Sequence, residues 1–327
     1  MTRTAIDLDE AVPGTPPPTP RRLLGIGVAV TAGVTVAVQS RINGELGVRL
    51  ADGIAAAVVS FATGLAILAV LVPASPAGRR GLAALRRVLA RGELRWWECL
   101  GGLCGALLVA TQGLTVGVLG VAIFTVAVVA GQSASSLLVD RAGIGPAGRH
   151  PVTTARLIGA ALAVLAVLLA VGNRLGDPGG LVLAVLPLLG GLTVAWQQAV
   201  NGRVNVATGS ALTATLVNFG AGTAALLVAF AVTVAVRGWP TGEPPTEPWL
   251  YLGGPIGIVF IAVAAVVVRF TGVLVLGLAT IAGQVIGAVV IDLVVPTEGV
   301  RPGVATLVGA ALTLVAVGVA AVGPGRR

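Results

Sequence analysis

The chain has 327 residues, of which 56% are hydrophobic and only 10% are charged, and its mean hydropathy is +0.99. An ordinary soluble domain is about one-quarter charged, so this composition excludes a soluble globular domain and indicates a membrane protein. The net charge of +8 rests on 21 basic residues, all of them arginine. Their distribution, described below, indicates membrane topology rather than nucleic-acid binding.

The first 20 residues are polar and rich in proline, and we expect them to form a disordered cytoplasmic tail. Ten apolar segments follow, each close to the roughly 20 residues that a helix needs to cross a bilayer. Within lipid, only helices and closed barrels satisfy the backbone, so we predict an all-α polytopic membrane protein. The predicted segments are 23–43, 53–72, 96–116, 118–139, 152–172, 180–200, 211–236, 249–268, 272–294 and 303–322.

The arginines predict the orientation of these segments. If the first residue is cytoplasmic, the cytoplasmic segments hold 16 arginines and the outer loops hold 5. The positive-inside rule then places both termini in the cytoplasm of a multi-pass protein of the inner (plasma) membrane. The densest run, "GRRGLAALRRVLARGELRWW" at 78–97, reads as an amphipathic connector that lies on the cytoplasmic headgroups.

The sequence contains an internal repeat. Residues 31–66 align without a gap on 189–224, with 13 of 36 positions identical, and 120–140 align on 272–292. We therefore predict two repeats, at 21–174 and 175–327, with five helices each. Because five is odd, the second repeat enters the membrane from the opposite side, which gives ten transmembrane helices in two inverted five-helix repeats.

Polar residues spaced for one helical face recur at equivalent places in the two repeats. The stripes in 23–43 and 180–200 match one another, as do those in 118–139 and 272–294. Such side chains face protein or water, and their pairing favours a substrate pathway, although amides and hydroxyls between membrane helices can also serve only to hold the helices together. The candidate pathway residues are Thr35, Gln39, Asn43, Gln132, Ser136, Thr193, Gln197, Asn201, Asn218 and Gln284.

Two carboxylates, Asp140 and Asp292, lie at the C-terminal ends of matching helices, where the helix dipole disfavours them. Capping therefore does not explain them. They either pair with a nearby arginine, such as Arg141 or Arg301, or act as a gate or a proton-coupling group. Another acid near a helix, Glu98, is expected to be solvated at the interface. The absence of acids from mid-membrane positions favours neutral, anionic or zwitterionic cargo.

These motifs resemble the drug/metabolite transporter (DMT) superfamily, and within it the YdcZ-type inner-membrane exporters. The resemblance covers nearly all of 22–322 and implies an EamA/DMT-like fold in a fused two-repeat form. Asn218 stands for Ser60, and Ala288 for Ser136, in the second copy. The residues that carry the resemblance are Gln39, Asn43, Ser60, Phe61, Gly64, Gly131, Gln132, Ser136 and Asp140.

We expect a secondary active transporter that exports a small metabolite or drug-like molecule by alternating access. The alternatives are a membrane-embedded lipid-handling protein or enzyme, and an assembly partner without transport. Enzymatic activity is not expected, because no metal signature or catalytic dyad is found in the apolar segments. We expect no cofactor, no metal and no nucleic acid. The expected partners are a small-molecule substrate and the lipid bilayer, and the protein is expected to be a monomer or a homodimer.

Overall fold

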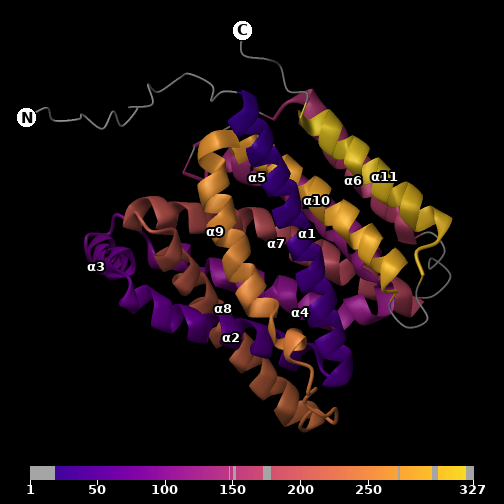
Figure 1. Ribbon diagram of the computed structural model, residues 1–327, viewed down its shortest axis with the longest axis horizontal. Coiled ribbons are helices and arrows are strands. Elements are labelled where there is room, and N and C mark those ends of the chain that lie inside the picture. The colour runs from indigo at the N-terminus through magenta and orange to yellow at the C-terminus, as the bar shows by residue number, and fades with distance from the viewer. Residues whose placement is uncertain are drawn as a thin grey trace, which may run out of the picture.

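The computed structural model describes residues 19–146, 148–149, 152–171, 178–271, 273–296 and 301–321. Most of the predicted tail and the predicted repeat boundary at 174 and 175 lie outside these residues. The described chain is helical throughout (Figure 1). Its α-helices are α1 (Thr19–Arg49), α2 (Gly53–Ala74), α3 (Pro76–Ala90), α4 (Gly101–Leu119), α5 (Val121–Ala142), α6 (Thr154–Val171), α7 (Pro178–Thr208), α8 (Ala211–Arg237), α9 (Gly253–Thr271), α10 (Val273–Val294) and α11 (Val304–Ala321), and its 3-10 helices are η1 (Trp96–Leu100) and η3 (Pro248–Tyr251).

Each predicted apolar segment coincides with a helix, and α1 and α7 both extend beyond their predicted ends. Among the described residues, seven helices are long and apolar enough to cross a membrane. The count of ten crossings and the inverted orientation of the repeats stay predictions. The seven candidate spans are Leu23–Arg49, Gly53–Ala74, Trp96–Leu119, Val121–Ala142, Leu183–Thr208, Ala211–Arg237 and Leu276–Val294.

The helix caps, like the helices, occur at equivalent positions of the two repeats. Asp52 caps α2, because its Oδ1 accepts hydrogen bonds from the backbone nitrogens of Ile54 and Ala55, each at 2.8 Å. At the position that the repeat makes equivalent, Ser210 caps α8 by accepting from the Thr213 nitrogen at 3.2 Å. Both residues satisfy N–H groups that a helix start leaves without partners.

The arginine-rich connector is an amphipathic helix in its own right, α3, followed by η1. Ser75 caps α3, and Pro76 occupies its first position, where a missing N–H costs nothing. Trp96 is 72% exposed at the start of η1, which suits a side chain that anchors at a membrane interface.

The main helix contacts join one repeat to the other. Helix α1 packs on α9 and α10, and α7 packs in the equivalent way on α4 and α5. Helices α2 and α8 contact each other, and α6 runs beside α11 at the upper right of Figure 1. Where α2 crosses α8, the rings of Phe61 and Phe219 lie 5.0 Å apart between centroids, within a buried cluster.

Glycines allow these helices to touch through their backbones. A Cβ atom on Gly283 of α10 would meet the Val30 carbonyl oxygen of α1. In the equivalent contact of the other repeat, a Cβ atom on Gly131 of α5 would meet the Leu188 carbonyl oxygen of α7. Small residues at helix crossings are typical of membrane proteins, where close backbone packing replaces the hydrophobic effect as the force between helices.

Candidate functional site

The polar stripe of α1 faces the start of α9, and we call this contact the first joint. Gln39 donates a hydrogen bond from Nε2 to the Gly253 carbonyl oxygen at 2.6 Å. Asn43 is fully buried, and its Oδ1 lies against Gly253. A Cβ atom on Gly257 would stand 3.0 Å from Gln39 Nε2. Only residues without a side chain let the two amides approach the α9 backbone this closely.

The stripe of α7 faces the start of α4 in the same way, and we call this contact the second joint. A Cβ atom on Gly101 would stand 2.5 Å from Asn201 Oδ1, and a Cβ atom on Gly105 would stand 2.5 Å from Gln197 Nε2. The four residues of each joint occupy equivalent positions of the two repeats. The paired stripes therefore pack on matching pairs of glycines, each from the opposite repeat.

The phenylalanine pair lies between the two joints. A Cβ atom on Gly105, in the second joint, would contact the Phe61 ring at 3.4 Å, and one on Gly257, in the first joint, would contact the Phe219 ring at 3.5 Å. The amides therefore form two polar layers with the phenylalanine pair between them.

The first joint continues into a buried hydrogen-bond network between α1 and α4. Asn43 donates from Nδ2 to Gln112 Oε1 at 2.6 Å, and Gln112 donates from Nε2 to Ser40 Oγ at 3.0 Å. All three residues are at most 2% exposed. The Oδ1 atom of Asn43 is buried with no hydrogen-bond partner in the described chain, so it is an acceptor that a ligand or a water could use.

Sequence reasoning missed Gln112 and Ser40. The repeat selects residues that are identical in both halves, but Ala264 stands at the position equivalent to Gln112 and Gln198 at that equivalent to Ser40. A scarce polar residue in a predicted membrane helix was the remaining signal for Gln112.

The second joint has its own network, centred on Asn218 of α8. Its Oδ1 atom accepts hydrogen bonds from Asn201 Nδ2 at 2.9 Å and from Gln197 Nε2 at 3.1 Å. Asn218 is 4% exposed. One carbonyl oxygen therefore ties both amides of the α7 stripe to α8, and the predicted residues Gln197, Asn201 and Asn218 do come together.

The other predicted pathway residues lie outside these networks. The hydroxyl groups of Thr35, Thr193 and Ser136 donate to carbonyl oxygens of their own helices, at 2.7–2.8 Å. The side chains of Gln132 and Gln284 are half-buried and make no side-chain hydrogen bond within the described part of the chain. Their amides are thus left for water or a ligand.

The two aspartates have different partners. The expected ion pair with an arginine occurs at Asp140, although its arginine is neither of the two named from the sequence. Asp140 forms an ion pair with Arg156 of α6 rather than with Arg141. Asp292 caps a helix: its Oδ1 accepts from the Val121 nitrogen at 3.0 Å and its Oδ2 from the Ala122 nitrogen at 2.7 Å. The expectation that capping does not explain these residues is wrong for Asp292, because the capped helix is α5, in the other repeat.

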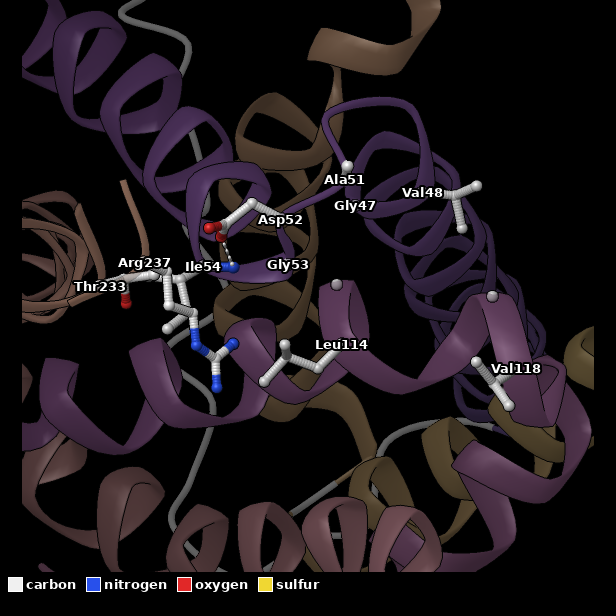
Figure 2. Close-up of a pocket in the computed structure, with 12 residues that line it drawn as sticks. Gly47, Val48, Ala51, Asp52, Gly53, Ile54, Leu114, Val118, Thr233 and Arg237 are labelled. Atoms are coloured by element: carbon white, nitrogen blue, oxygen red, sulfur yellow. Dashed lines mark hydrogen bonds between the residues drawn. The ribbon is translucent and has the colours of Figure 1, made fainter. Parts of the chain in front are cut away.

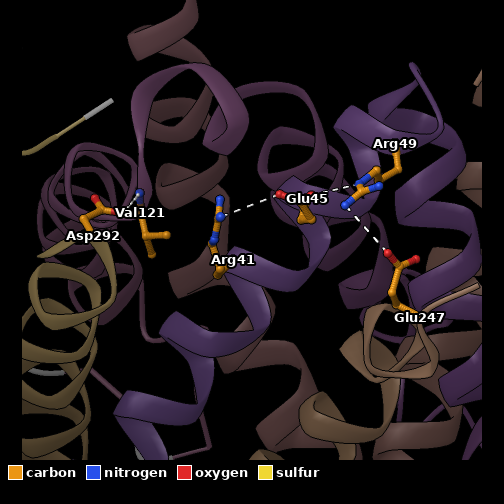
Figure 3. Close-up of polar contacts among 6 residues, drawn as sticks. All are labelled: Arg41, Glu45, Arg49, Val121, Glu247 and Asp292. Carbon is orange, nitrogen blue, oxygen red and sulfur yellow. Dashed lines mark hydrogen bonds and ion pairs between the residues drawn. The ribbon is translucent and has the colours of Figure 1, made fainter. Parts of the chain in front are cut away.

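Charged residues of α1 continue from Asp292 towards the loop before η3 (Figure 3). Arg41 lies between Asp292 and Glu45 in this view. Glu45 pairs with Arg41 at 3.6 Å and with Arg49 at 3.0 Å, and Arg49 reaches Glu247 at 3.7 Å. Opposite charges therefore alternate along one end of the molecule, the end that the predicted topology places outside.

At the opposite end, Glu98 is buried rather than solvated. Its side chain is 0% exposed, its Oε2 accepts from the Arg95 nitrogen at 2.6 Å, and its Oε1 lies 2.6 Å from Nε of Arg203 on α7. The contact with Arg203 is an ion pair without the alignment of a hydrogen bond. The expectation of a solvated Glu98 fails because η1 folds back under α7.

A cavity of about 240 Å³ opens beside the α1–α4 contact (Figure 2). Its wall includes Gly47, Gly113, Asp52 and Arg237. None of the predicted pathway residues lines this cavity. A Cβ atom on Gly113 of α4 would meet the Gly53 carbonyl oxygen of α2, so these two helices are in backbone contact beside the cavity.

Comparisons with known proteins agree with this architecture. A family model described as "Putative inner membrane exporter, YdcZ" matches residues 24–169 and again residues 182–319. One of the solved structures that match is a crystal structure with a TM-score of 0.53 and 18% sequence identity, over 92% of this chain and 96% of its own. At that identity the likeness shows the fold alone. No curated protein matches this chain. The two matched segments together span most of the sequence, so the chain belongs to the YdcZ family of inner-membrane exporters in the DMT group, in a two-repeat form.

Proposed function

We propose that this protein is a secondary active transporter that exports a small metabolite or drug-like molecule across the inner membrane by alternating access. Membership of an inner-membrane exporter family supports transport. The observation that carries the mechanism is the double occurrence of one joint, with two amides of α1 or α7 packed on two glycines of α9 or α4. Two equivalent joints are what a transporter needs if one opens while the other closes.

The energy of such a joint suits a gate. Hydrogen bonds between membrane helices are worth about 0.6 kcal/mol on average and rarely more than about 1.7. Opening the first joint would break the bond from Gln39 to Gly253 and expose the unpartnered Oδ1 of Asn43. Differential binding of cargo can supply a few kcal/mol, so cargo that bonds to the freed amides can shift the population of the two states.

The chemistry of the joints also limits the cargo. The amides offer both donors and acceptors, and the described carboxylates of the helices are engaged with a helix start or with arginines. Nothing at the joints supplies a net negative charge to hold a strongly cationic drug. The cargo is therefore a neutral, anionic or zwitterionic molecule with hydrogen-bonding groups, and the cytoplasmic placement of both termini belongs to the same proposal.

The test is efflux from cells that express the full-length protein. Metabolite profiles of the medium are compared for wild type, Gln39→Ala and Gln197→Ala, at equal amounts of protein in the membrane. The matched control is Gln198→Ala, because this glutamine is exposed next to Gln197. We expect metabolites that accumulate outside wild-type cells to fall at least tenfold in the two joint variants and to stay at the wild-type level in the control.

Equal efflux from all variants would remove the joints from the mechanism. A wild-type profile identical to that of cells without the protein, combined with altered membrane lipids, would favour lipid handling over export.

A further inference from the structure

We propose that Asp292 is the latch of the gate at the first joint, and that Asp140 is the equivalent latch of the opposite gate in the alternate conformation. The proposal rests on the alternating-access function above and identifies positioning residues for it. We do not propose that either aspartate binds cargo. Each acts by holding the start of a helix that belongs to the other repeat.

The contact that we call the latch joins Asp292 of α10 to the start of α5. Helix α5 starts after Gly120, which has no side chain to cap it, and the Asp292 carboxylate instead accepts from the first two N–H groups, at 3.0 and 2.7 Å. Asp292 is 3% exposed. A helix start carries partial positive charge, and hydrogen bonds to a carboxylate are stronger than those between neutral groups. Separating α10 from α5 would leave both partners unsatisfied.

The position of this contact connects it to the first joint. Val121 and Ala37 belong to one buried cluster with Val116 of α4 and Ala288 of α10. That cluster therefore joins the capped start of α5 to α1, α4 and α10. In Figure 3, Arg41 of α1 lies beyond Val121 from Asp292, and it pairs with Glu45 at 3.6 Å. Movement of α10 away from α5 would thus loosen the network that holds α1 against α4.

The repeat supplies the second latch. Asp140 is equivalent to Asp292, and Val273, the first residue of α10, is equivalent to Val121. In this structure Asp140 pairs with Arg156, within its own repeat. The two aspartates therefore occupy equivalent positions of the two repeats but have different partners. The amides of both joints are packed on their glycines here, so the two ends differ in the aspartates: Asp292 holds a helix start and Asp140 does not. In the proposed exchange, Asp140 leaves Arg156 to cap α10 when Asp292 releases α5.

The experiment measures access to the α1–α4 contact. Both native cysteines are replaced, by Cys99→Ala and Cys104→Ala, and Ser40→Cys places a thiol in the contact, where the serine is 2% exposed. Whole cells are treated with a membrane-impermeant maleimide, and the labelling rate is read for the full chain in its membrane. We expect Asp292→Asn to raise this rate at least tenfold, and Asp140→Asn to leave it unchanged or to lower it.

A second variant weakens the same contact without touching the carboxylate. Val121→Pro removes one of the two donors at a position where helices accept proline, and we expect it also to raise labelling. The matched control is Asp52→Asn, because Asp52 caps α2 within its own repeat at the same end of the molecule. We expect the control to label at the rate of the parent protein.

The outcomes separate this proposal from the proposed function. Unchanged labelling in Asp292→Asn and Val121→Pro, in protein that melts like the parent, would overturn the latch and leave transport to its own test. Equal increases in Asp292→Asn, Asp140→Asn and Asp52→Asn would also overturn it, since general loosening would explain them. Increases confined to Asp292→Asn and Val121→Pro support the latch even if no efflux is detected from wild-type cells.

Discussion

Removal of the Gln112 side chain should weaken the closed first joint more than any exposed amide substitution. Gln112 lies on α4, is 2% exposed, and connects two residues of α1 through hydrogen bonds of 2.6 and 3.0 Å. In Gln112→Ala, Asn43 loses the partner of its Nδ2, while its Oδ1 already has none in the described chain. Both ends of a buried amide are then unsatisfied.

The magnitude follows from these contacts. Two interhelical bonds of average strength in a membrane contribute about 1.2 kcal/mol. A buried donor left without a partner adds a penalty of about 1 to 3 kcal/mol when water cannot reach it. Ser40 loses less than Asn43, because its hydroxyl still donates to the Val36 carbonyl oxygen at 3.0 Å. We therefore expect Gln112→Ala to cost about 2 to 4 kcal/mol, equal to a change of about 30-fold or more in an equilibrium constant.

The assay is reversible unfolding of the purified protein in bicelles, with Gln198→Ala as an exposed control that should change stability by less than about 0.5 kcal/mol. Gln112→Leu keeps most of the volume and removes the bonds, so it should lose nearly as much as Gln112→Ala. A double-mutant cycle with Asn43→Ala should return a coupling energy of about 0.6 to 1.7 kcal/mol. Wild-type stability in Gln112→Leu would refute the reasoning, because packing alone would then hold α4 on α1.

Two further predictions concern helix crossings and the buried ion pair. Gly222→Ala places a Cβ against a phenylalanine ring and 2.7 Å from a carbonyl oxygen, so it should destabilise the protein by about 1 to 3 kcal/mol. Gly220 has open space around it, so Gly220→Ala should be neutral or stabilising in the same melting assay. Arg203→Ala leaves the fully buried Glu98 carboxylate without its cation and should lower the melting temperature strongly. The double variant Glu98→Leu/Arg203→Leu should restore most of the loss; a double variant no better than Arg203→Ala would contradict this account.

The helices and the two amide stripes could largely be predicted from the sequence, for a physical reason. A membrane helix needs a long apolar run, and two glutamine and asparagine pairs at the same spacing must lie on matching helix faces. Which helix those faces contact could not be predicted. Gln39 meets Gly253, 214 positions along the chain, and glycines are too frequent in this sequence for one of them to stand out.

The partners of the acids were predicted less well, because nearness in sequence is a poor guide to nearness in a bundle. Arg141 adjoins Asp140 in sequence, but the ion pair forms instead with Arg156 of α6. Asp292 binds backbone N–H groups, which leave no trace in a sequence beyond a glycine before an apolar run. Backbone donors at a helix start compete well with arginine for a buried carboxylate.

The positions at which the repeats differ explain how two equivalent gates can have unequal strength. Arg41 and Glu45 stand where the second repeat has Ala199 and Arg203. At the first joint they extend a line of charges whose outer pairs are exposed, with Arg49 at 50% and Glu247 at 39%, so each contributes at most about 1 kcal/mol and is screened by salt. In the proposed mechanism, the aspartates and the amides, which are identical in the two repeats, provide the two states, and the unmatched charges set only a modest preference between them. A preference of that size is one that cargo binding can reverse.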